Sequence, residues 1–111
     1  MKVYGIKNCN SVKKSLDLLS NKGVEYEFVD FKKTPPQQHQ VVKWIDSKGF
    51  DVVINKKGMM WRKLPDEAKE NLNQESAVEL ALEKPSIIKR PLVEVDGNVL
   101  IGVDELEQHL G

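Results

Sequence analysis

The chain of 111 residues contains one cysteine, two histidines and only 6% aromatic residues. With Cys9 as the single thiol, no disulfide can form within the chain, and a zinc site built from several cysteines is excluded. Basic and acidic residues both number 17, so the formal net charge is zero. This balance gives no sign of a direct nucleic-acid partner. We expect no metal site and no bound cofactor.

Long apolar runs are also missing. No stretch approaches the roughly 18 consecutive apolar residues that a membrane span requires, and the opening MKVYGIKNC has no apolar signal core. Because a free thiol suits a reducing compartment, we expect a cytoplasmic protein without a membrane partner. Hydrophobic residues make up 40% and charged residues 31% of the chain, as in one ordinary globular domain. No apolar stripe demands a partner, so a monomer is expected.

The first third of the sequence predicts two strands joined by a helix. Residues 2–6 form a short apolar run, residues 11–22 carry an apolar stripe at helical spacing, and residues 25–31 alternate. Gly23 stands where a helix-ending glycine is common. Since a helix connects the two strands, we expect them to be parallel with a right-handed crossover.

The middle of the chain is predicted to be mostly helical. One helix is expected to begin with Thr34 as its N-cap, Pro35 in its first turn and Gln37 completing a capping box, and to end at Gly49. A second helix is expected at 73–84. Residues between these two helices give weaker signals, typical of short helices or irregular structure.

The last third predicts a hairpin and a final helix. Apolar runs at 92–95 and 99–101 are joined through Asp96-Gly97, a strong hairpin signal. A helix is expected at 103–110, with Asp104 and Glu107 as its capping box. The order β-α-β, helical middle, β-β-α predicts an α/β thioredoxin-like fold with a mixed sheet. We expect one domain over 1–111 with a helical insertion at about 34–84.

Cys9 is the residue best placed for chemistry, because it lies between a strand end and a helix start. The first N–H groups of a helix lack partners and carry partial positive charge. A thiolate there is stabilised, so its pKa should fall below the free value of ~8.5. We expect the N–H groups near Asn10 and Ser11 to contribute, with nearby positive charge from Lys7. The alternative is a buried, inert cysteine.

Position 12 is Val12, so the chain has no C-x-x-C motif and no internal dithiol cycle. Any redox turnover therefore needs an external thiol, for which glutathione or another small thiol is the natural candidate. Arg90 could bind an anion through its fork of donors, although a surface arginine without a role is the more frequent case. Pro91 suits the start of a strand.

Three segments resemble the arsenate reductase (ArsC-like) family, and within it the YffB and Spx-like branch. They are YGIKNC at 4–9, NKKGMMWRKL at 55–64 and PSIIKRPL at 85–92. The resemblance spans essentially the whole chain and implies a thioredoxin-like sheet with a helical insertion. It also implies that Cys9 is the catalytic cysteine, that Arg90 is an oxyanion-binding arginine facing it, and that Pro91 is a cis proline.

The leading function implied by the resemblance is that of a glutathione-dependent thiol oxidoreductase, with glutathione as co-substrate. An alternative is an Spx-like regulator that binds the RNA polymerase alpha subunit without catalysis. True arsenate reduction is disfavoured: arsenate reductases of this type use two further arginines, and Asn55 stands at the position of one while the other has no match. A degenerate member with a vestigial site is the remaining alternative.

Overall fold

The computed structural model describes residues 1–111, and the chain forms two compact units. The first unit joins both ends of the chain, Met1–Thr34 and Arg90–Gly111, and the second is the intervening segment, Pro35–Lys89. All four strands belong to the first unit, whereas the second is built from helices.

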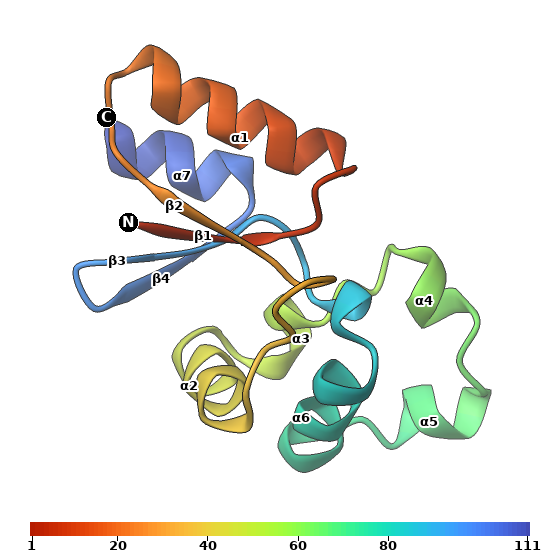
Figure 1. The fold of residues 1–111 in the computed structure, drawn as a ribbon. Helices are drawn as coiled ribbons and strands as arrows, with labels where there is room; N and C mark the ends of the chain where they lie inside the picture. The colour runs from red at the N-terminus through yellow and green to blue at the C-terminus, as the bar shows by residue number, and fades with distance from the viewer. The chain divides into compact units, whose positions relative to one another are not determined.

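The first unit is a mixed sheet with two helices. Its elements are β1 (Lys2–Gly5), α1 (Asn10–Asn21), β2 (Glu27–Asp30), β3 (Leu92–Val95), β4 (Asn98–Ile101) and α7 (Val103–Leu110). The strand order is β2-β1-β3-β4, with only the β1–β2 pair parallel. Helices α1 and α7 contact each other and cover one face of the sheet (Figure 1). The predicted thioredoxin-like α/β fold is confirmed.

The core of this unit lies between the sheet and its two helices. Val3 of β1 and Val93 of β3 are opposite each other in the register, and both pack against Leu19 of α1 and Leu106 of α7. All four side chains are fully buried. Full burial of such a side chain contributes about 1.5–3 kcal/mol, so this cluster fixes both helices onto the central strands.

The hairpin between β3 and β4 has the predicted turn. Asp96 and Gly97 both have positive φ, 50° and 79°, as a two-residue type I′ turn requires. The predicted cap of the last helix is wrong. Gly102, with φ 91°, is the N-cap of α7, which begins at Val103. Because the chain turns at this glycine, Asp104 already lies in the first helical turn and cannot serve as N-cap.

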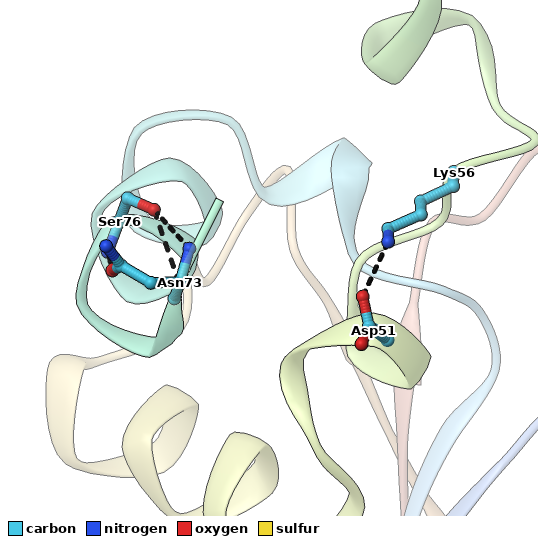
Figure 2. Close-up of polar contacts among 4 residues, drawn as sticks. All are labelled: Asp51, Lys56, Asn73 and Ser76. Atoms are coloured by element: carbon cyan, nitrogen blue, oxygen red, sulfur yellow. Dashed lines mark hydrogen bonds and ion pairs between the residues drawn. The ribbon is translucent and has the colours of Figure 1, made fainter. Parts of the chain in front are cut away.

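The second unit contains five α-helices and one short 3₁₀ helix. They are α2 (Gln38–Lys48), α3 (Phe50–Val53), α4 (Met59–Arg62), α5 (Asp66–Glu70), α6 (Gln74–Glu83) and η1 (Pro85–Ile87). Helices α2 and α6 contact each other, and Trp44 of α2 is completely buried. Asn73 caps α6 through a reciprocal capping box with Ser76, and Lys56 contacts Asp51 at 2.5 Å (Figure 2).

The predicted start of α2 is also wrong. The N-cap is Gln37, which forms a capping box with Gln40, and Thr34 lies outside the helix. Pro35 precedes Pro36, and a residue before proline is driven out of the α region. The two prolines therefore keep the chain extended and delay the helix. No helix of the chain is both long and apolar enough to cross a membrane.

Candidate functional site

Cys9 is the N-cap of α1. Its backbone is extended, with φ −106° and ψ 127°, and its carbonyl accepts a hydrogen bond of 3.0 Å from the Lys13 N–H. The Cys9 N–H donates to the Ile6 carbonyl at 3.3 Å, which closes the short turn after β1. A side chain at the N-cap faces the N–H groups of the second and third helical residues. Here these residues are Ser11 and Val12.

The close approach of β1 to α1 fixes the position of this turn. Gly5 is the last residue of β1, and a Cβ atom added to it would lie 2.7 Å from Cγ2 of Val12. Val12 is fully buried, and a β-branched side chain in a helix has little rotamer freedom. Glycine at position 5 therefore allows the first turn of α1, and with it Cys9, to pack directly on the strand end.

Strand β3 brings Arg90 to the same place. Tyr4 of β1 pairs with Leu92 of β3 in antiparallel register, so the residues that precede Leu92 lie opposite the residues that follow Tyr4. The Arg90–Pro91 peptide bond is cis, which confirms the expectation for Pro91. Pro91 is buried, and its carbonyl accepts a hydrogen bond of 2.9 Å from the Gly102 N–H. Arg90 therefore stands beside the turn that carries Cys9.

The Cys9 thiol is acidified by its neighbours. Partial burial raises its pKa, but hydrogen bonding from the Val12 N–H, from the Arg90 side chain and from the Ser11 N–H lowers it, as does the charge of Arg90. The lowering influences prevail, so the pKa lies below that of an ordinary thiol. The neutral Cys9 side chain accepts no capping hydrogen bond, so these N–H groups lower the pKa through the negative charge of the thiolate.

The other predicted site residues contribute unequally to the stabilisation of the Cys9 thiolate. Lys7, Asn10 and Ser11 are exposed and lie next to Cys9 in the chain. Of the helical N–H groups, those of Val12 and of the expected Ser11 lower the pKa of the thiol, and Val12 is the donor that the sequence did not indicate. The missed donor follows from capping geometry, because Cys9 as N-cap faces the second and third helical N–H groups rather than the first.

Asn55 has a local structural role in the helical unit. Its N–H donates to the Ile87 carbonyl at 2.8 Å, and its side-chain oxygen accepts from the Lys57 N–H at 3.2 Å. This is the geometry in which asparagine organises a turn. Gly58 packs against the Asn55 side chain, where a Cβ atom would approach to 2.9 Å. Asn55 is thus engaged in shaping the segment before α4.

The sheet order, the cis proline and a cysteine at the start of the first helix define a thioredoxin-like protein with a single thiol in its site. The ArsC family model matches residues 4–109, and the chain belongs to the ArsC family. Its fold is that of a thiol oxidoreductase.

Individual relatives agree with this assignment. A Haemophilus influenzae protein of uncharacterised function is 36% identical over 95% of this chain and 92% of its own length. The solved structure of a protein called YFFB has a TM-score of 0.92 and 34% identity, covering 98% of this chain and 96% of that one. An ArsC-related protein from Brucella melitensis has a TM-score of 0.81 and 33% identity, covering 98% and 92%.

Proposed function

We propose that the protein is a glutathione-dependent thiol oxidoreductase in which Cys9 is the nucleophile. The observation that carries the proposal is the pairing of Cys9 with the start of α1 and with the Arg90 side chain, which together lower the pKa of the thiol. Thiolates are the reactive form of cysteine, and catalytic thiols are found in such electropositive, partly exposed places. Membership of the ArsC family supports thiol chemistry at this position.

In the first step, the Cys9 thiolate attacks one sulfur of a mixed disulfide between glutathione and a substrate thiol. A bond forms between Cys9 and the glutathionyl sulfur, the old S–S bond breaks, and the substrate leaves as a thiolate that takes a proton from water. The Ser11 and Val12 N–H groups hold the attacking anion in place. Arg90 carries a guanidinium that can bind an anionic group of the substrate.

In the second step, the thiolate of a second glutathione attacks the glutathionyl sulfur on Cys9. Oxidised glutathione is released, and the Cys9 thiolate is restored. Over the cycle one glutathione thiol is consumed, its sulfur replaces the substrate sulfur in the disulfide, and the substrate is released as a free thiol, so the cycle balances without a cofactor. Because Cys9 is the only cysteine in the chain, the external thiol is indispensable for turnover.

The test is the reduction of a glutathionylated peptide, measured as formation of oxidised glutathione. The Cys9→Ser variant should lose turnover. A matched control combines Cys9→Ser with Ser20→Cys, which moves the single thiol to an exposed position at the C-terminal end of the same helix. There the helix dipole disfavours an anion. If this control turns over as fast as the wild type, a special role for the position of Cys9 is refuted.

An Spx-like binding role is the second candidate, and the helical unit supplies the observation that favours it. Met59 is 69% exposed and Val52 is 40% exposed, and these are the large apolar side chains of the chain that are most open to solvent. Under this alternative the Cys9→Ser variant would still capture the RNA polymerase alpha subunit, and Met59→Asp would abolish capture. Failure of the wild type to bind the purified subunit would exclude it.

Arsenate reduction remains disfavoured. The position of one further arginine of arsenate reductases is held by Asn55, whose backbone and side chain are committed to the turn before α4. An amide cannot replace the charge of a guanidinium toward an oxyanion. We expect no arsenate-dependent oxidation of glutathione above the uncatalysed rate.

A further inference from the structure

A groove of about 330 Å³ lies beside β2, the outer strand of the sheet. Residues of β2 and of the segments that follow β1 and β2 line it: Lys7, Glu27, Phe28, Val29, Asp30, Lys33 and Thr34. All of them belong to the first unit. The volume is at the lower end of the range for small-molecule sites. Since Lys7 and Cys9 both follow the carboxyl end of β1, the end of the groove at Lys7 and the reactive thiol lie at the same end of the sheet.

The backbone of β2 offers hydrogen-bond donors to this groove. The N–H groups of Glu27 and Phe31 donate inward to Met1 and Gly5, at 2.9 and 2.8 Å. Backbone direction alternates along a strand, so the N–H groups of Phe28 and Asp30 point to the outer edge. No strand of the sheet lies beyond β2. A short extended peptide can therefore place its carbonyl oxygens against this edge.

The charges of the groove are arranged along its length. Lys7 follows the carboxyl end of β1 and Lys33 follows that of β2, and because these strands are parallel, both lysines lie at the same end of the sheet. Both are exposed and line the groove. The groove thus has two cations at the end nearest Cys9. Asp30 and Glu27 add carboxylates along the strand, and Oδ1 of Asp30 already accepts from the Lys32 N–H at 2.9 Å.

We propose that this groove is the subsite for the second glutathione, the one that resolves the mixed disulfide on Cys9. The glycine carboxylate lies between Lys7 and Lys33, and the neighbouring peptide group lies against the outer edge of β2. This assignment rests on the proposed function, and it makes Lys7 and Lys33 the residues that determine specificity for glutathione.

Binding is tested with S-methylglutathione, which cannot form a disulfide, by NMR titration of the full chain. Amide shifts should be concentrated at residues 27–34 and at Lys7. Lys33→Gln should raise the dissociation constant roughly two- to fivefold, the range of an exposed ion pair, and the effect should disappear at high salt. Lys32→Gln is the matched control, because Lys32 is exposed and adjacent but does not line the groove. Equal effects of the two variants, or shifts elsewhere, would overturn the assignment.

Kinetics separate this assignment from the proposed function. Lys33→Gln should raise KM for glutathione while leaving the second-order rate with 2-mercaptoethanol unchanged, since that thiol has no carboxylate. Turnover with an unchanged KM would refute the groove and leave the oxidoreductase intact. Binding of S-methylglutathione in the groove without any turnover would refute the oxidoreductase and leave the groove assignment standing.

Discussion

Replacing Gly5 by alanine tests whether the contact between β1 and α1 positions the reactive thiol. The added Cβ would lie 2.7 Å from Cγ2 of Val12, far inside van der Waals contact. Overpacking of this kind costs about 1–3 kcal/mol. For a chain of this length each kcal/mol lowers Tm by about 4 °C, so Gly5→Ala should lower it by roughly 4–12 °C in thermal unfolding followed by circular dichroism.

The same substitution should disturb the thiol. If α1 is pushed away from the strand, Cys9 moves relative to Arg90, and the pKa of the thiol should rise toward its ordinary value. A double-mutant cycle with Val12→Ala, which removes the colliding methyl group, isolates the contact. The double variant should be at least ~1 kcal/mol more stable than the sum of the single effects predicts. Additive effects, or an unchanged Tm for Gly5→Ala, would refute the steric reasoning.

Three further expectations concern the site and the hairpin. Arg90→Ala should raise the pKa of Cys9, so the midpoint of the pH profile of alkylation by iodoacetamide should shift to higher pH than in the wild type. Arg90→Lys should reverse part of this shift. Because folding lowers the pKa of Cys9, the charged thiol stabilises the fold above the unfolded-state value of ~8.5, and this contribution is lost as pH falls through the folded value. In urea unfolding, Cys9→Ser should therefore cost more stability at pH 9 than at pH 6. Gly97→Ala places a Cβ at φ 79° and should cost about 1–2 kcal/mol by the same assay.

The sheet could be predicted from sequence because its signals are local and agree with one another. The Asp96-Gly97 dipeptide fixes the hairpin register, and the apolar stripe of α1 matches the face that packs on the strands. The errors fall at helix starts. At Pro35 the restriction imposed by the following proline outweighs its preference for a first helical turn, and at Gly102 a positive φ moves the N-cap ahead of Asp104.

The candidate site was predictable only in part. The place of Cys9 at a helix start follows from the strand and helix patterns. The contact between Arg90 and the thiol depends on the antiparallel pairing of β1 with β3, a long-range register that periodicity does not contain; only the family resemblance suggested it. The groove beside β2 could not be predicted from local sequence either. Lys33 resembles any surface lysine, and only the parallel pairing of β1 with β2 places it at the same end of the sheet as Lys7.

The first unit is assembled from the two ends of the chain, and this has a consequence during synthesis. In a nascent chain Cys9 is made before the helical segment, but Arg90 and strand β3 follow only after that whole segment has been made. Until then the sulfur lacks its guanidinium partner and remains an ordinary, weakly ionised thiol. The reactivity of the thiol therefore increases only when the sheet closes, so that an incomplete chain on the ribosome is less exposed to premature oxidation.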